Sequence, residues 1–377
     1  MRPRKLTLGM DRFSGLYLWV ALIILFGIWV PSTFLTFSTV QSVASLQAIT
    51  AMTGLAILVP LLAGQFDLSV GATVNLTTIV VACLQSRSGW AMWPAIGVAV
   101  ASGVAVGGIN AFIVVRLRVS SFIATLGMAT VLTAVISIIS GPSQPLPPSS
   151  IAWNNLTQTQ VFGIQIVFYY LLALAVILWW MLDHTPAGRY ISAVGGNPEA
   201  ARLSGVRTNR WAAISLVVSA GVSGVVGILY SSLNGPSLTF GPTLLLPAFA
   251  AAFLGSTQFR PGRFNVWGTV VAVYILGTGI QGMQLVTGVQ WISDMFNGVA
   301  LIIAVAFAVW RQTAADASRR RALSRRSKRR SLADGASSSG GVASESGQLD
   351  PSGNGPPRGP DDDVSRTPAN SPTSSSS

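Results

Sequence analysis

Two carboxylates, Asp67 and Asp294, lie inside apolar stretches of the sequence. A charged side chain at the centre of a lipid bilayer costs about 2.5–3.5 kcal/mol on insertion scales, so it usually has a specific role. Asp67 stands in the run Gly64–Gly71, and three roles are open: contact with a solute, proton transfer, or hydrogen bonding to the amides of an interrupted helix. The neighbouring Ser69 and glycines suit the third role, which is at least as well supported as the first. A position at the membrane interface would be enough to explain Asp294.

The sequence lacks the residues that a metal site or a nucleophilic catalytic site would need. Cys83 is the only cysteine and His184 the only histidine, so neither a zinc site nor a His-based triad can be assembled. A membrane enzyme such as a lipid-linked transferase would need an acidic or His cluster, and the one acidic run, at 361–363, lies in a tail with too few apolar residues to fold. We predict no catalytic residue, no metal and no cofactor bound by this chain.

Nucleotide hydrolysis is also excluded. A P-loop requires Gly-x-x-x-x-Gly-Lys followed by Ser or Thr, but Lys5 precedes Leu and Lys328 precedes Arg, and the sequence has no other lysine. If ATP drives a process in which this chain takes part, another polypeptide must bind and hydrolyse it.

Neutral polar side chains interrupt several apolar stretches. Such groups both donate and accept hydrogen bonds, which suits hydroxylated solutes better than ions. The same residues could equally bond one helix to another. The candidates for a solute path or for structural bonding, together with Asp67, are Gln47, Gln65, Ser69, Asn75, Asn110, Gln281, Gln284 and Asn297.

A hydrophilic loop at 183–210 contains the clearest local structure signal. Asn197 can cap free helix amides, and Pro198 suits the first helical position. Glu199 and Arg202 complement the two ends of a helix dipole, and Gly205 can adopt the left-handed conformation that ends a helix. The sequence therefore predicts a short surface helix, either a simple connector or a shape for a partner to bind. Its candidate residues are Arg189, Gly195, Gly196, Asn197, Pro198, Glu199, Ala200, Ala201, Arg202, Leu203, Ser204 and Gly205.

The elements that carry these residues are membrane helices. Half of the 377 residues are hydrophobic and a tenth are charged, more apolar surface than a water-soluble domain of this length can bury in one core. Apolar stretches of roughly 17–25 residues recur, the length that a helix needs to cross a hydrocarbon layer. We predict an all-α polytopic membrane protein with about ten transmembrane helices, at 14–35, 39–63, 68–84, 91–115, 120–140, 163–182, 211–231, 239–256, 264–286 and 288–310.

Charge sets the orientation of these helices. With a cytoplasmic N-terminus, the basic residues fall on the cytoplasmic side, as the positive-inside rule requires. They are Arg2, Arg4, Lys5, Arg12, Arg116, Arg118, Arg189, Arg202, Arg207, Arg210, Arg260, Arg263 and those of the C-terminal tail. Only Arg87 falls outside, so the ten segments and two cytoplasmic termini support each other. The proline-rich stretch 141–162 has no basic residue and is predicted to be the largest external loop.

The chain thus divides into three regions. A cytoplasmic N-terminus (1–13) precedes the transmembrane domain (14–310), and a basic, then Ser- and Gly-rich tail (311–377) lacks the apolar residues to fold. The net charge of +12 does not indicate nucleic-acid binding, because the basic residues flank membrane spans and no aromatic side chains interleave with those of the tail.

Glycine and proline predict two broken helices. The first is near Gly64–Gly71, with Pro60 just before it, and the second is near Gly255–Gly268, with Pro261 and Gly262 inside it. Non-helical backbone at membrane depth must be buried in protein or face a water-filled cavity, so such breaks often line transport routes. Because glycine and proline are also common in membrane helices, each residue alone is weak evidence.

Across roughly residues 40–310 the sequence resembles the ribose and related monosaccharide permeases of bacterial ABC importers. Gly64–Gly71 resembles the family's Gly-x-x-Asp-Leu-Ser-Val-Gly signature, and Ser121–Gly127 its Pro-Phe-Ile-Ala-Thr-Leu-Gly segment. The run from Gly188 to Gly205 is similar to its Gly-Arg…Gly-Gly-Asn…Ala-Ala-Arg-Leu-Ser-Gly loop, and this match is the most specific.

The resemblance implies a function and a set of partners. The loop would be the coupling helix that docks on an ATPase with two nucleotide-binding domains, which would bind ATP and magnesium. A second permease protomer and an extracytoplasmic solute-binding protein would complete the importer, in the bacterial cytoplasmic (inner) membrane. The chain would be the transport subunit for a monosaccharide or a similar polyhydroxylated solute.

Departures from the family pattern leave the solute open. Ser121 replaces the usual proline, Ala111 follows Asn110 where glycine is common, and the 255–262 loop has fewer glycines than usual. An alternative hypothesis is a secondary transporter in which Asp67 cycles a proton.

Overall fold

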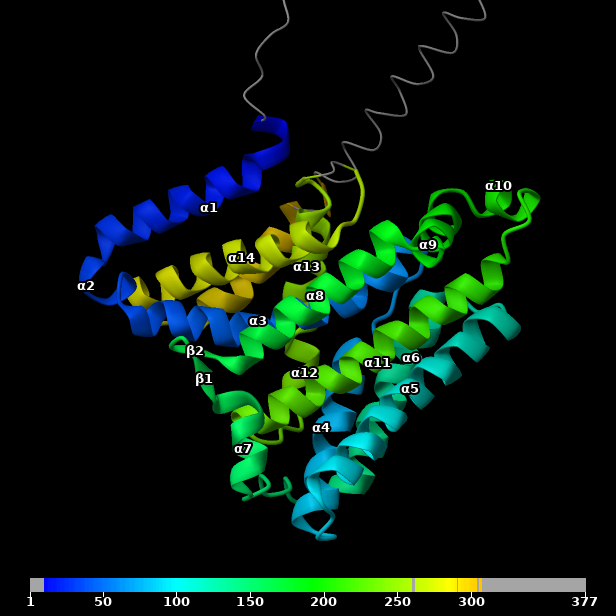
Figure 1. The fold of residues 1–377 in the computed structure, drawn as a ribbon, viewed down its shortest axis with the longest axis horizontal. Helices are drawn as coiled ribbons and strands as arrows, with labels where there is room; N and C mark the ends of the chain where they lie inside the picture. Colours follow the sequence, from blue (N-terminus) through cyan, green and yellow to red (C-terminus); the bar gives the residue numbers. More distant parts are fainter. Residues whose placement is uncertain (1–9, 260–261, 290, 304, 307–377) are drawn as a thin grey trace, which may run out of the picture. The chain divides into compact units, whose positions relative to one another are not determined.

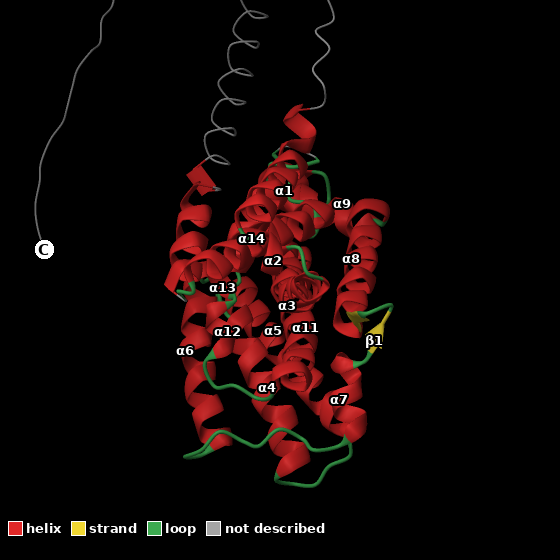
Figure 2. Ribbon diagram, turned by 90° about the vertical axis from the view of Figure 1, so that its left-hand side faces the viewer, coloured by secondary structure: helices red, strands yellow, loops and turns green. Residues whose placement is uncertain are grey.

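The computed structural model describes residues 10–259, 262–289, 291–303 and 305–306. Helices dominate these residues, and their only strands form one short hairpin (Figures 1 and 2). The elements are α1 (Met10–Trp29), α2 (Pro31–Phe34), α3 (Phe37–Leu62), α4 (Val70–Ser86), α5 (Met92–Arg116), α6 (Ser121–Ser140), α7 (Ile151–Gln158), β1 (Gln160–Val161), β2 (Ile164–Gln165), α8 (Ile166–His184), α9 (Pro186–Gly196), α10 (Pro198–Leu203), α11 (Thr208–Asn234), α12 (Phe240–Thr243), α13 (Leu245–Gly255), α14 (Val266–Thr287) and a last helix, Trp291–Ile303.

The helices have the lengths of membrane spans. Six of them within the described residues, α3, α5, α6, α8, α11 and α14, are long and apolar enough to cross a bilayer. Four shorter apolar helices are Gly15–Trp29, Val70–Ser86, Phe240–Gly255 and Trp291–Ile303. Each of the ten predicted segments overlaps one of these helices. The chain is an all-α membrane protein with several spans.

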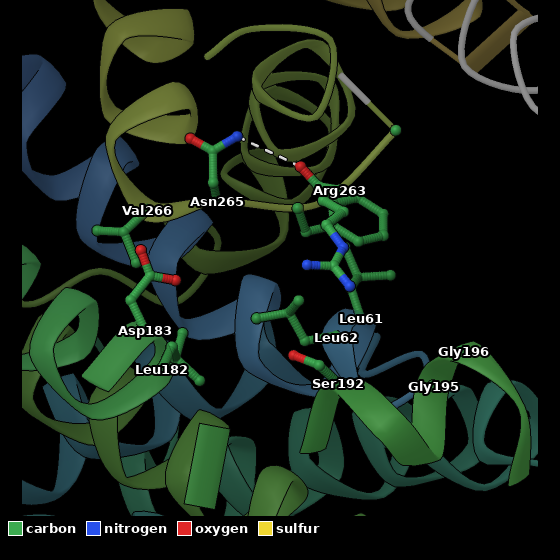
Figure 3. Close-up of a pocket in the computed structure, with 12 residues that line it drawn as sticks. Leu61, Leu62, Leu182, Asp183, Ser192, Gly195, Gly196, Arg263, Asn265 and Val266 are labelled. Atoms are coloured by element: carbon green, nitrogen blue, oxygen red, sulfur yellow. Dashed lines mark hydrogen bonds between the residues drawn. The ribbon is translucent and has the colours of Figure 1, made fainter. Parts of the chain in front are cut away.

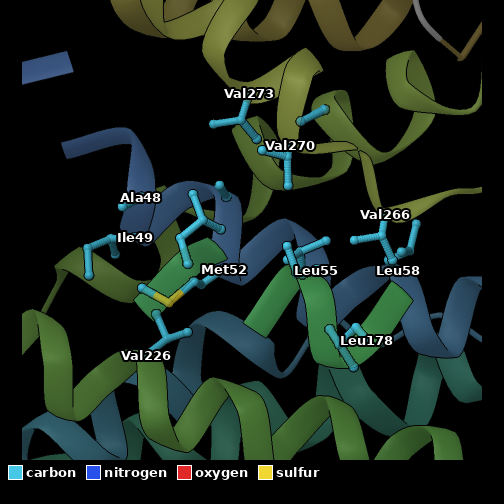
Figure 4. Packing of buried hydrophobic residues seen from close by; sticks show 14 of the residues in the cluster. Ala48, Ile49, Met52, Leu55, Leu58, Leu178, Val226, Val266, Val270 and Val273 are labelled. Atoms are coloured by element: carbon cyan, nitrogen blue, oxygen red, sulfur yellow. The ribbon is translucent and has the colours of Figure 1, made fainter. Parts of the chain in front are cut away.

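Helix α3 is buried along most of its length and packs against α8, α11, α13 and α14. In its core, Met52, Leu55 and Leu58 face Leu178 of α8 and Val226 of α11 (Figure 4). Elsewhere small residues bring helix backbones together, as is usual between helices in lipid. Between α5 and α11 the approach is so close that a Cβ on Gly107 would lie 2.8 Å from Val217 Cα.

The first predicted interruption is real but shorter than the sequence suggests. Pro60 lies inside the last turn of α3 and Gly71 inside the first turn of α4, so only residues 63–69 are non-helical. The carbonyl of Pro60 accepts hydrogen bonds from the amides of Ala63 and Gln65, both at 2.9 Å, which ends the helix. Gly71 is needed for a close contact with another helix rather than for a bend.

Two predicted segments contain breaks that the sequence analysis did not place. The segment 14–35 is divided at Val30, before Pro31, and the segment 239–256 is divided at Leu244 into α12 and α13. The second break, between α13 and α14, lies within the predicted range but is shorter, because Gly255 and Gly268 are helical; it covers residues 256–265, of which 260–261 lie outside the described residues.

The predicted external loop 141–162 is partly folded. It contains α7, whose first turn is capped by Ser150, and Trp153 of α7 is 1% exposed. Ser232 of α11 donates a hydrogen bond to the carbonyl of Trp153 at 2.6 Å. The predicted cytoplasmic N-terminus and the tail after 306 lie almost wholly outside the described residues.

Candidate functional site

Asp67 lies in the break between α3 and α4 and is fully buried. Its Oδ1 accepts hydrogen bonds from the amide of Ser69 at 3.0 Å and from the Ser69 hydroxyl at 2.6 Å. Its Oδ2 accepts one from the hydroxyl of Ser219 on α11 at 2.9 Å. Asn110 of α5 donates to the Ser69 oxygen at 2.8 Å. The carboxylate therefore ties the break to α11 and, through Ser69, to α5.

Two hydroxyls of α6 hold the backbone of the same break. Ser121 Oγ accepts a hydrogen bond from the amide of Phe66 at 3.0 Å, and Thr125 Oγ1 accepts one from the amide of Leu68 at 3.0 Å. These amides would otherwise have no helical partner. Ser121 stands where the family pattern has proline, and its hydroxyl supplies an acceptor that a proline side chain lacks.

The three predicted residues Asp67, Ser69 and Asn110 thus come together in one buried network. Both carboxylate oxygens of Asp67 are occupied by donors of this chain. The geometry favours the hypothesis in which Asp67 shapes the broken helix over those in which it contacts solute or carries a proton. Sequence reasoning missed Ser219, because its distance of 152 positions from Asp67 leaves no local pattern.

Asn265 has the same role in the second break and was also missed. Its Nδ2 donates to the carbonyls of Gly255 at 3.0 Å and Gln258 at 3.1 Å, while its Oδ1 accepts from the amide of Gly268 at 2.6 Å. One amide thus caps α14 and holds the end of α13. The local signal was an Asn three residues before a glycine at the beginning of an apolar stretch.

Asn75, another predicted polar residue, bonds α4 to the segment that leads into α12. Its Nδ2 donates to the carbonyl of Leu238, and its Oδ1 accepts from the amide of Gly241, both at 2.6 Å. Beside it, Gly71 and Gly241 meet backbone to backbone, and a Cβ on Gly71 would lie 2.5 Å from the Gly241 oxygen. Asn75 therefore has a structural role in this conformation.

The predicted surface helix is present as α10. The side chain of Asn197 accepts a hydrogen bond from the amide of Ala200 at 3.0 Å, and Pro198 is the first helical residue. Glu199 and Arg202 form an ion pair of 2.8 Å. Gly205 follows the helix with a φ of +80°. Leu203 is 81% exposed, so α10 offers an apolar side chain to a partner.

A second helix, α9, joins α10 to the membrane domain. Ile191 and Val194 of α9 are buried, and Tyr190 packs on Trp211 of α11 with ring centroids 5.2 Å apart. At the end of α9, Gly195 lies directly on the carbonyl of Leu62, where a Cβ would collide. The surface helix pair therefore contacts α3 at the point where the first break begins.

A cavity of about 420 Å³ lies beside this contact (Figure 3). Leu62 of α3, Ser192 and Gly195 of α9, and the segment from Gly262 to Val266 line it. The end of α3, the second break and α9 thus surround one space. Of these elements, α9 contacts the end of α3 directly, through Gly195 and Leu62.

The remaining predicted polar residues are dispersed. Gln65 and Gln281 are half-buried. Gln284 of α14 donates to Ser293 Oγ of the last helix at 2.6 Å. Asn297 is 8% exposed and lines a separate cavity together with Gln47 of α3, another of these residues. The structure does not unite the predicted polar residues in a single site.

Known proteins resemble this chain over most of its membrane domain. The family model described as "Branched-chain amino acid transport system / permease component" matches residues 39–305. The ribose import permease protein of Escherichia coli (strain K12) is 30% identical over 263 residues, 67% of this chain and 79% of the relative. The fructose import permease protein of Rhizobium meliloti is 30% identical over 301 residues, 76% of this chain and 82% of the relative. The ribose import permease protein of Haemophilus influenzae is 29% identical over 252 residues, 66% and 77%.

Proposed function

Because the chain belongs to the family of branched-chain amino acid transport system permease components, we propose that it forms the membrane path of an ATP-driven importer for a monosaccharide or a similar polyhydroxylated solute. The relatives named for ribose and fructose import support this class of solute. Importers of this type contain an ATPase and a solute-binding protein in addition to the permease. The chain would work as a pair of protomers, identical or paralogous, in the bacterial cytoplasmic membrane.

One observation carries the mechanism. The exposed helix α10 is joined through α9 to the break between α3 and α4, where Gly195 lies on Leu62. We propose that the ATPase binds α10 and that its movement shifts α9 against the end of α3. The segment 63–69 would transmit this shift to α5, α6 and α11, because Asn110, Ser121, Thr125 and Ser219 contact that segment or Asp67 within it.

The exposed Leu203 allows a direct test of ATPase docking. Its side chain is 81% exposed, and Leu146, in the predicted external loop, is 76% exposed and serves as a matched control. We expect Leu203→Asp to remove the ATPase from the tagged chain purified in mild detergent, because a charge at the centre of an apolar contact is costly to bury. The variant Leu146→Asp should retain the ATPase.

The alternatives give distinct results. Retention of the ATPase by both variants would contradict the docking role of α10. Purification of the unmodified chain alone, at normal yield, would contradict the importer itself and favour the proton-coupled carrier. Identification of the co-purified proteins, with a repeat in which residues 197–205 are scrambled, completes the test.

A further inference from the structure

A second cavity lies in the membrane domain away from the coupling helices. It has a volume of about 270 Å³, is partly open, and is lined by residues of α3, α12, α13, α14 and the last helix. Figure 1 labels α3, α12 and α14, which each contribute residues to the cavity wall. Small-molecule sites in proteins usually measure about 300–1,000 Å³. This cavity is near the lower limit and therefore suits a ligand the size of one sugar ring.

The wall of this cavity combines polar and apolar side chains. Its polar lining residues include Thr50 of α3 and Asn297 of the last helix, and its apolar ones include Phe240 and Pro247. Asn297 is 92% buried, and its Oδ1 has no hydrogen-bond partner in the described residues. A buried acceptor without a partner costs about 1–3 kcal/mol. This amide is therefore positioned for a donor that the chain itself does not supply.

Asp294 adds a charge to the same wall, one helical turn from Asn297. It is exposed in the single chain and lies within an apolar helix. A carboxylate facing hydrocarbon is costly, so this side of the cavity faces water, the membrane interface or a polar ligand rather than the hydrocarbon layer. A carboxylate and an amide together can accept and donate hydrogen bonds to neighbouring hydroxyl groups.

We propose that this cavity contacts a polyhydroxylated solute during its passage, with Asp294 and Asn297 hydrogen-bonded to solute hydroxyls and Phe240 and Pro247 against its carbon surface. The proposal rests on the importer function. It assigns to Asn297 a role as a solute contact, whereas Asp67 and Asn75 belong to structural networks. The cavity is bounded by the broken helix pair α12 and α13, where non-helical backbone at membrane depth is tolerated if it lines a cavity.

The test compares a sugar with analogues that each lack one hydroxyl. The complex with its ATPase and binding protein is reconstituted in vesicles, and uptake of D-ribose, D-fructose and D-allose is measured to select the transported sugar. The variants are Asn297→Leu, Asp294→Asn and, as a control on the same helix, Met295→Leu, whose side chain is exposed and does not line the cavity. Discrimination by the binding protein is common to all variants and cancels in the comparison.

A site that bonds a hydroxyl discriminates against the analogue that lacks it. We expect one deoxy analogue to be transported roughly tenfold more slowly than the parent sugar by the unmodified complex, as the loss of one hydrogen bond to a charged or buried partner predicts. In Asn297→Leu this ratio should fall to the discrimination that the binding protein alone retains, and in Asp294→Asn it should fall less, because an amide still bonds hydroxyls, while Met295→Leu keeps it. A merely structural role would slow both sugars equally.

Two further results overturn the proposal in different ways. If both variants keep the original ratio for every analogue while ATP-driven uptake is normal, the cavity is not the contact site, although the importer function stands. If the unmodified complex hydrolyses ATP but takes up none of the three sugars, the proposed class of solute is wrong. The ligand proposed for this cavity is then wrong as well. Should Asn297→Leu fail to assemble, Thr50→Val, at another residue of the cavity wall, carries the same ratio test.

Discussion

Asp67 accepts three hydrogen bonds from Ser69 and Ser219 while fully buried. We expect Asp67→Asn to keep the two bonds from Ser69 and to let the Ser219 hydroxyl reverse and accept, at a loss of about 1 kcal/mol of stability. Asp67→Ala leaves every donor without a partner and should cost about 1–3 kcal/mol for each. Thermal unfolding in detergent measures both changes.

The variant Asp67→Asn also separates the structural role of Asp67 from proton transport. We expect ATP-dependent uptake to survive in Asp67→Asn, since an amide retains the shape of the break but cannot cycle a proton. Abolished uptake in a variant of normal thermal stability would contradict the structural role and support a proton-coupled carrier. Collapse of the proton gradient in ATP-replete cells should likewise leave uptake by the unmodified chain intact.

Asn265 predicts an unusual response to an otherwise mild substitution. At most helix N-termini Asn and Asp are nearly equivalent caps, and Asn197 acts there only as an acceptor. Asn265 also donates to the carbonyls of Gly255 and Gln258. We expect Asn265→Asp to lose about 1–3 kcal/mol, because a carboxylate cannot donate to these carbonyls.

Asn197→Asp is the matched control, with an expected change below about 0.5 kcal/mol. Unfolding temperatures of the two variants, measured side by side in one detergent, show whether the donor bonds of Asn265 stabilise the protein. Equal temperatures would mean that the donor bonds of Asn265 contribute nothing to stability.

These two asparagines also show what the sequence could predict at the scale of residues. The cap at Asn197 was predicted because its partner is three positions away in the chain. The bonds of Asn265 to Gly255 and Gln258 were not, because the path of the loop decides which carbonyls are near. Asp67 was identified from its charge in an apolar stretch, but its partner on α11 could come only from the tertiary structure.

At the scale of elements, the contact between α9 and α3 makes adjacent glycines unequal. A Cβ on Gly195 would collide with the carbonyl of Leu62, whereas a Cβ on Gly196 would meet nothing within 4 Å. We expect Gly195→Ala to displace α9 and to weaken the coupling between ATP hydrolysis and uptake. Substitutions along such contacts typically change coupling by about 0.5–2 kcal/mol. Gly196→Ala should behave as the unmodified chain does.

The measurement is the amount of sugar transported per ATP hydrolysed in reconstituted vesicles. A lowered ratio with ATPase activity retained is the result that uncoupling predicts. Equal ratios in the two variants would show that the contact between Gly195 and Leu62 does not transmit the movement of the ATPase.

Apolar stretches were enough to predict every apolar helix, because length and hydropathy are properties of local sequence. Their internal breaks were predicted less well. Gly71 appeared to be a breaker but is helical, since it serves the contact with Gly241. The break at Leu244 carries no glycine or proline at its own position. Its neighbour Gly241 is held from α4 by Asn75.

At the scale of the whole molecule, Arg87 is the one basic residue that the predicted orientation places outside. Its guanidinium donates to the carbonyls of Ser140 at 2.6 Å, Ser143 at 3.1 Å and Ile139 at 3.3 Å. A cation at a helix C-terminus satisfies free carbonyls and complements the helix dipole. The end of α6 thus gives Arg87 a local role, and the exception does not weaken the orientation proposed for the chain.

The orientation and the number of spans can be tested together at three exposed positions. Helix α4 has 17 residues, about 25 Å at 1.5 Å per residue, which is short for a hydrocarbon layer of about 30 Å. The segment 63–69, bonded to the first turns of α6, continues its path within the protein. We therefore expect α4 to complete a crossing, which gives four spans between Ser32 and Ser149 and one more before Ala193.

In a Cys83→Ala background, Ser32→Cys and Ser149→Cys should both react with an impermeant maleimide on intact cells. Ala193→Cys should react only after permeabilisation, since the predicted orientation places the basic loops inside. All three native residues are exposed in the structure. If α4 did not cross, only three spans would separate Ser32 from Ser149, and these positions would label from opposite sides. Labelling of Ala193→Cys from outside would reverse the orientation and remove α10 from the reach of any ATPase in the cytoplasm.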